Sequence, residues 1–111
     1  MTRWIAVLAA LSGAMAIAAG AFGAHGAAKQ VADLLKTGGQ YQLVHAVAAL
    51  VALRMNARWP AALFVFGGAL FAMSLYALAL GAPRLVGAIT PLGGVTMIVG
   101  WLWLAWMAAR V

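Results

Sequence analysis

Four long apolar runs, joined by short connections that carry the charges, leave this chain few ways to fold. The runs cover residues 4–24, 40–55, 61–80 and 90–109. A helix rises about 1.5 Å per residue, so about 20 residues cross the roughly 30 Å hydrocarbon core of a bilayer. We therefore expect an all-α integral membrane protein, a four-helix bundle, with residues 1–111 as a single four-span transmembrane domain.

The composition favours lipid over water as the surrounding solvent. Hydrophobic residues make up 68% of the 111 residues and charged residues 7%, whereas a soluble domain carries about 25% charged residues. The net charge is +6, but the cations stand singly at the ends of the apolar runs. This distribution is typical of charges that flank membrane spans and meet anionic lipid, and we expect no nucleic-acid binding.

The first run has a competing interpretation as a secretory signal peptide, because Arg3 precedes it and small residues end it. It is long for a signal peptide, and three further runs follow, so we favour a retained span. Small residues in three of the runs predict close helix packing in lipid. They are Ser12, Ala16, Gly20, Ala24, Gly67, Gly68, Gly93 and Gly94.

Residues 28–37, between the first two runs, predict a short amphipathic helix lying in the membrane interface. Its apolar residues share one side of a helical wheel: Val31, Leu34 and Leu35. The Thr-Gly-Gly sequence at 37–39 is expected to end this helix and turn the chain. The second run is short, so its polar residues are expected at or just below the interface.

The polar residues of the second run fall on one helix face. Tyr41 and His45 are four residues apart, and Gln42 and His45 are three apart. His25 ends the first run, and we expect it at the same depth as His45. The predicted cluster, with two members from the third and fourth runs, is His25, Tyr41, Gln42, His45, Ser74 and Thr90.

This cluster is compatible with several roles. The two histidines could ligate a metal or haem, pass protons, or hydrogen-bond a quinone-like head group. A structural role is the alternative that we favour, because interhelical hydrogen bonds hold helices together in lipid. We expect no cofactor and no metal, since two histidines without a nearby carboxylate or thiolate form an incomplete ligand set.

Enzyme chemistry has little support, and we expect a non-enzymatic protein. Asp33 is the single carboxylate side chain, and the chain has no cysteine, which excludes paired-carboxylate catalysis within one chain and cysteine nucleophiles. No nucleophile elbow or phosphate-binding loop is present. A proton-coupled cation exporter of four spans would need an acidic residue inside a span, and the runs contain none.

Topology follows from the number of spans. With four spans, both termini and the 54–60 connection lie on one side, which carries Arg3, Arg54, Arg58 and Arg110. The other side carries three cations and Asp33. The excess of cations predicts cytoplasmic termini. We expect Trp4, Trp59 and Trp106 on this same side, as interfacial aromatic residues.

Five motifs occur in order along the chain: GAFGAHG (20–26), YQLVHA (41–46), LFAMSLY (70–76), ITPLGG (89–94) and GW (100–101). On these motifs the sequence resembles the domain of unknown function 423 family, which holds small bacterial inner-membrane proteins of the YgdD/YwdK type and the animal transmembrane protein 256. The resemblance implies four membrane helices in the inner membrane and no established activity. Ala72-Met73 departs from the Ser-Gly pair that is usual in the family.

We therefore expect a multi-pass protein of the bacterial inner membrane that acts as a structural or interaction protein or as an accessory subunit. Its expected partners are the lipid bilayer and other membrane subunits or further copies of itself. Two alternatives remain open: a small oligomeric channel or transporter that uses His25 and His45, and a membrane subunit that binds haem, quinone or metal.

Overall fold

The computed structural model describes residues 2–110, and every regular element in this range is helical. The elements are α1 (Thr2–Ala24), α2 (Lys29–Arg54), α3 (Arg58–Ala79), the 3-10 helix η1 (Arg84–Ala88) and α4 (Thr90–Ala109). Three helical stretches are long and apolar enough to cross a membrane: α1, α3 and the combined η1–α4 stretch. The fold is thus all-helical, with the expected apolar runs inside its helices.

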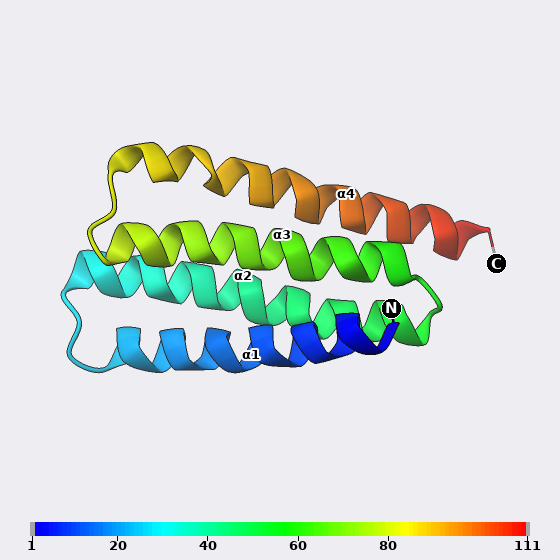
Figure 1. The fold of residues 1–111 in the computed structure, drawn as a ribbon, viewed down its shortest axis with the longest axis horizontal. Helices are drawn as coiled ribbons and strands as arrows, with labels where there is room; N and C mark the ends of the chain where they lie inside the picture. The colour runs from blue at the N-terminus through cyan, green and yellow to red at the C-terminus, as the bar shows by residue number, and fades with distance from the viewer. Residues whose placement is uncertain (1, 111) are drawn as a thin grey trace.

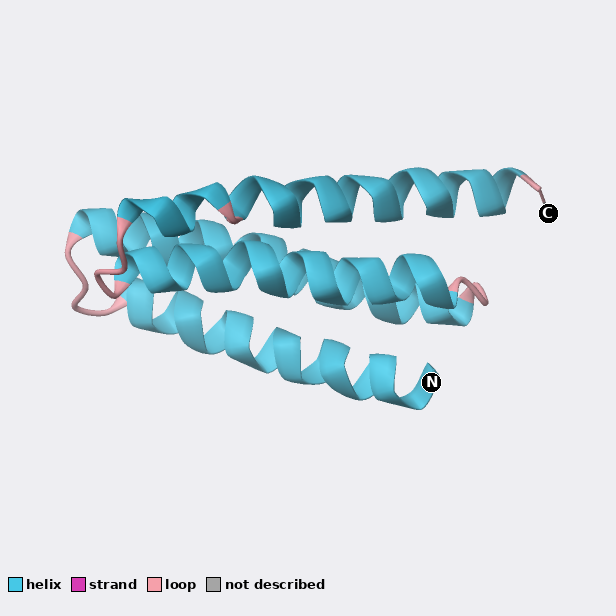
Figure 2. Cartoon of the chain, turned by 45° about the horizontal axis from the view of Figure 1, so that its top comes forward, coloured by secondary structure: helices cyan, strands magenta, loops and turns pink. Residues whose placement is uncertain are grey.

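The long helices run side by side, each antiparallel to the next (Figure 1). α2 and α3 form the centre, α1 packs mainly against α2, and α4 packs against α3. The loops gather at the two ends of the molecule, apart from a short break between η1 and α4 (Figure 2). Both termini lie at the end that holds the α2–α3 turn (Figure 1), and so do Trp4, Trp59 and Trp106.

The separate interfacial helix expected at 28–37 is not present, because Lys29–Arg54 forms one continuous helix. The apolar face of its first turns does exist, but it packs against the end of α1. Leu35 is buried there, and its Cβ lies 3.2 Å from the position that a Cβ on Gly23 would take. This protein contact replaces the lipid interface that the helical wheel suggested.

The Thr-Gly-Gly sequence at 37–39 does not end the helix either. Gly38 and Gly39 are buried, and a Cβ on Gly38 would lie 2.7 Å from the ring of Tyr76. A Cβ on Gly39 would lie 3.0 Å from the carbonyl oxygen of Ala16 on α1. The two glycines are therefore contact points for neighbouring helices, a role that glycine often has in membrane helices.

Close packing also joins α3 to its two neighbours. A Cβ on Gly68 would lie 3.2 Å from the Cβ of His45, and one on Gly67 would lie 3.0 Å from the backbone of α4. A Cβ on Gly93 would lie 2.5 Å from the backbone nitrogen of Phe71. Gly94 and Gly20, by contrast, have open space in the direction of a Cβ, and Ala24 is exposed.

Candidate functional site

Gln42 is the centre of the polar contacts inside the helices. Its side chain is 1% exposed. Its Nε2 donates to Ser12 Oγ on α1 at 2.9 Å and lies 3.6 Å from Met15 Sδ, while its Oε1 accepts from the hydroxyl of Tyr76 on α3 at 2.7 Å. One carboxamide therefore connects three helices, and both of its polar atoms have partners.

Gly38 makes the bond between Tyr76 and Gln42 sterically possible. It lies one helical turn before Gln42 on the same face of α2, where the Tyr76 ring passes over it. Any larger residue at position 38 would occupy the space of the ring atoms. The glycine therefore positions a phenol hydroxyl against a buried amide, which is a contact that the sequence interpretation did not include.

His45 connects α2 to α4. Its Nδ1 lies 2.7 Å from the carbonyl oxygen of Tyr41, and its Nε2 accepts from Trp101 Nε1 at 2.9 Å. A carbonyl can only accept and an indole N–H can only donate, so the two bonds together require the neutral imidazole with its proton on Nδ1. Protonation of Nε2 would place two donors face to face and break the contact with Trp101.

Aromatic rings enclose this imidazole. The ring centroids of Phe64 and Trp101 lie 5.7 and 5.8 Å from that of His45, both in edge-on geometry. The Phe64 and Trp101 centroids are themselves 4.6 Å apart. His45 is 6% exposed, and neither nitrogen has a lone pair or proton left for a metal, a haem or a proton path in this arrangement.

Ser74 and Thr90 form a separate contact between α3 and the start of α4. Ser74 Oγ donates to the carbonyl oxygen of Phe71 at 2.7 Å, so its hydroxyl proton is used within α3. The hydroxyl of Thr90 must therefore be the donor in the Ser74–Thr90 bond. The ring of Tyr41 lies against Phe71, with centroids 4.8 Å apart, but its hydroxyl takes no part in these bonds.

His25 does not join the cluster, and the expectation that it shares a depth with His45 is wrong. It is exposed in the connection before Lys29. His45 lies 16 residues beyond Lys29 on the continuous α2, which corresponds to about 24 Å along the helix axis. The uninterrupted helix is the physical reason, because the sequence interpretation had ended the preceding helix at 37. Within residues 2–110, no three His, Cys, Asp or Glu side chains come close enough to hold a metal.

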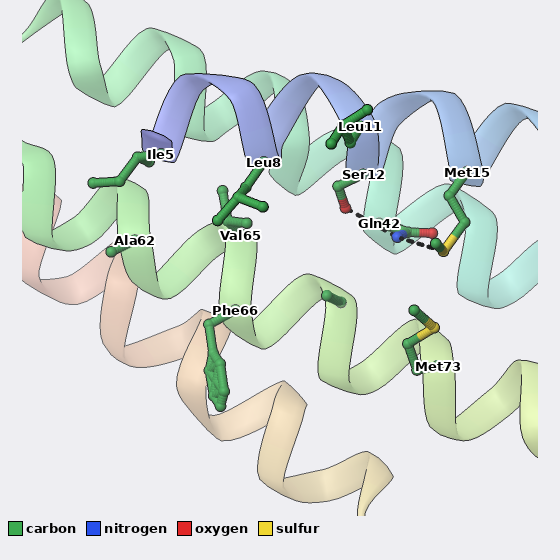
Figure 3. Close-up of a pocket in the computed structure, with 11 residues that line it drawn as sticks. Ile5, Leu8, Leu11, Ser12, Met15, Gln42, Ala62, Val65, Phe66 and Met73 are labelled. Atoms are coloured by element: carbon green, nitrogen blue, oxygen red, sulfur yellow. Dashed lines mark hydrogen bonds between the residues drawn. The ribbon is translucent and has the colours of Figure 1, made fainter. Parts of the chain in front are cut away.

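An apolar groove opens between α1 and α3 above the Gln42 contacts (Figure 3). Its volume is about 390 Å³, and apolar side chains of α1 and α3 form its walls. Ser12 and Gln42 lie at its floor, with their hydrogen bond along the base (Figure 3). The groove exists because α1 packs on α2 far more extensively than on α3.

The sequence interpretation missed Trp101 as a partner of His45. The sequence interpretation treated tryptophans as interfacial residues, but Trp101 lies near the middle of α4 and contacts a histidine 56 residues earlier. Tyr76, which bonds to Gln42, was also absent from the predicted cluster. One signal could have indicated both contacts: the N–H of an indole or the O–H of a phenol that lies among apolar residues needs a hydrogen-bond partner.

Helices with apolar outer faces, whose few buried polar side chains bond to one another, define a small multi-pass membrane protein. The family model described as "Protein of unknown function (DUF423)" matches residues 19–94, and the chain belongs to this family. No solved structure matches this chain.

Curated relatives cover nearly the whole chain. A UPF0382 membrane protein of Staphylococcus epidermidis is 41% identical over 106 residues, which is 86% of this chain and 87% of the relative. The UPF0382 inner membrane protein YgdD of Escherichia coli K12 is 38% identical over 111 residues, covering 90% of this chain and 85% of the relative. The chain is accordingly a multi-pass protein of the bacterial inner membrane.

Proposed function

We propose that this protein is a non-enzymatic, four-span structural protein that binds other subunits in the inner membrane. The observation that carries the proposal is the pairing of the polar groups that are buried between its helices. Within the described residues, no buried side-chain nitrogen or oxygen lacks a hydrogen-bond partner. Gln42 and His45 therefore serve as connections between helices, which is the role that interhelical bonds have in lipid.

The depth of these connections supports α2 as the fourth span. α2 has 26 residues and is about 39 Å long, which exceeds the roughly 30 Å hydrocarbon core. Counting about 30 Å back from Arg54 puts the opposite boundary near residue 34 and the midplane near residue 44. Gln42 and His45 then flank the midplane. Lys29 and Asp33 lie beyond the hydrocarbon core, and Lys36 lies about two residues inside its boundary, where a long lysine side chain can reach the head groups.

Charge distribution supports cytoplasmic termini. The end with the termini and the α2–α3 turn has Arg3, Arg54, Arg58 and Arg110. The opposite end has Lys29, Lys36 and Arg84, with Asp33 as the single carboxylate side chain of the chain. The positive-inside rule assigns the end with more cations to the cytoplasm.

The geometry gives little support to the two alternatives. A channel or transporter that used His25 and His45 together would need both histidines in one pathway. His25 precedes the start of α2 at Lys29, and His45 lies about 24 Å further along the axis of that helix. A haem or metal subunit that used His45 would need a free imidazole nitrogen there, and both nitrogens of His45 are engaged.

The test is extraction of the tagged protein from native membranes in mild detergent, followed by a native gel, mass spectrometry and an absorbance scan of the same band. We expect co-migration with other membrane subunits or with further copies of the chain. A lone monomer would contradict the proposal, and a Soret band would replace it with a haem-binding function.

A matched pair of variants locates the contact surface. Ala69→Phe fills the groove between α1 and α3, which Ala69 lines. Ala105→Phe adds the same bulk on the exposed side of α4. If partners dock in the groove, Ala69→Phe releases them and Ala105→Phe does not.

A further inference from the structure

A second hollow lies at the end of the molecule that carries both termini. It has a volume of about 440 Å³, and all four long helices and the α2–α3 turn reach it. Its lining residues are Thr2, Leu53, Asn56, Arg58, Trp59 and Met107. Four of these side chains carry hydrogen-bond donors, and Leu53 and Met107 are apolar and less exposed.

The α2–α3 turn fixes this arrangement. Asn56 adopts the left-handed conformation with φ of 61°, which asparagine tolerates better than most residues. The backbone N–H groups of Asn56 and Ala57 bond back to the last turn of α2 at 3.1 and 2.8 Å. These backbone bonds hold the Asn56 carboxamide in place, two residues before Arg58, the first residue of α3.

Arg58 supplies the charge. Its guanidinium carbon lies 5.4 Å from the centroid of the Trp59 ring, in a cation–π arrangement. No acidic side chain is near, because the single carboxylate residue, Asp33, lies in the second turn of α2 at the opposite end. Among the described residues no salt-bridge partner is available to Arg58. The N–H groups of its planar guanidinium can therefore donate hydrogen bonds to an external anion.

We propose that this hollow binds the phosphodiester of an anionic phospholipid, with Arg58, Asn56 and Thr2 as donors and an acyl chain on Leu53 and Met107. Arginine suits a phosphate because its donors match two oxygens at once. Trp59 and Trp106 mark this end as the head-group level, where such a phosphate lies. Arg3, Arg54 and Arg110 at the same end favour a net negative lipid over a zwitterionic one.

The test uses the purified full-length protein in mild detergent, titrated with phosphatidylglycerol or phosphatidylcholine and followed by native mass spectrometry. We expect Arg58→Gln to weaken phosphatidylglycerol binding about tenfold, the loss of roughly one charge-assisted hydrogen bond. Arg84→Gln removes the same charge at the opposite end and should change binding less than about twofold.

Asn56→Gly provides a second variant that keeps the left-handed turn and removes the carboxamide. It should also weaken phosphatidylglycerol binding, and circular dichroism verifies that both variants remain helical. Equal losses for Arg58→Gln and Arg84→Gln, or no preference for phosphatidylglycerol over phosphatidylcholine, would overturn the proposal. Displacement of the lipid by millimolar inorganic phosphate would also overturn it, because the site would then recognise free phosphate.

Discussion

α2 and α4 reverse the usual relation between apolarity and burial. α4 is among the helices that are apolar enough to cross a membrane, yet it packs mainly against α3 and η1, and most of its large side chains are exposed. α2 is absent from that group, yet it packs extensively against both α1 and α3 and buries Gln42 and His45. In lipid, the outer helix must be apolar, whereas the central helix can carry polar groups that bond to its neighbours.

The two helices are also held in different ways. α4 depends on close backbone contact at Gly93 and on two side-chain bonds, one from Trp101 to His45 and one from Thr90 to Ser74. α2 depends on hydrogen bonds from Gln42 in two directions. Substitutions that affect one kind of contact and spare the other therefore test this difference.

The largest effect is expected from Gly93→Ala. The new Cβ would lie 2.5 Å from Phe71 N and 2.8 Å from Phe71 Cα, and backbone atoms cannot move aside as a flexible side chain can. We expect a loss of about 3 kcal/mol in the free energy of unfolding, the upper range for overpacking. Reversible unfolding in mixed micelles measures it. Gly94→Ala is the control, since nothing lies within 4 Å there; equal stability of the two variants would contradict the close packing of α4.

Gln42→Leu should lower stability by about 2 kcal/mol, from three interhelical contacts at about 0.6 kcal/mol each. The same substitution makes α2 more apolar, so hydropathy alone predicts the opposite sign. Gln40→Leu is the matched control, because Gln40 is exposed on the same helix. The same unfolding assay separates the two explanations: a Gln42→Leu protein as stable as Gln40→Leu would mean that the carboxamide does not hold α2.

The His45–Trp101 bond should contribute about 0.6 kcal/mol, the mean for interhelical hydrogen bonds in lipid. A double-mutant cycle with His45→Leu and Trp101→Phe isolates this coupling. Trp103→Phe replaces Trp101→Phe in the control cycle and should give a coupling near zero. Equal coupling energies in the two cycles would show that the His45–Trp101 bond does not contribute to stability.

The smallest effect is expected from Thr96→Val, within about 0.5 kcal/mol of the parent protein. Thr96 Oγ1 donates to the carbonyl oxygen of Leu92 at 2.8 Å, so its bond stays within α4. A thermal unfolding curve is a sufficient measurement. A large loss would show that α4 depends on polar contacts as strongly as α2 does.

The sequence predicted the helical class well, because long uncharged runs have few alternatives to helices in lipid. It also predicted the apolar face of residues 31–35 but assigned that face to the membrane interface. The error came from Gly38 and Gly39, since glycine pairs mark both turns and close helix contacts. The positions of Tyr76 over Gly38 and of the Ala16 carbonyl beside Gly39 distinguish these two meanings.

The candidate cluster shows a similar limit. Helical spacing grouped Gln42 with His45 on one face, and both are buried. Spacing within one helix cannot indicate which residues of other helices lie opposite, so Ser12 and Trp101 were not predicted as partners. The depth of His25 was wrong because the sequence interpretation placed a turn at residues 37–39. α2 continues through these residues, so His25 lies much farther from His45 along the helix axis.

The position of α2 across the membrane is the central claim, and single-cysteine labelling tests it most directly. The chain has no native cysteine, so each introduced thiol reports one position. With an impermeant maleimide, we predict that Gln30→Cys and Met55→Cys react from opposite sides, and that Val44→Cys reacts only after detergent is added. Labelling of Gln30→Cys and Met55→Cys from the same side would contradict a spanning α2 and the bundle built around it.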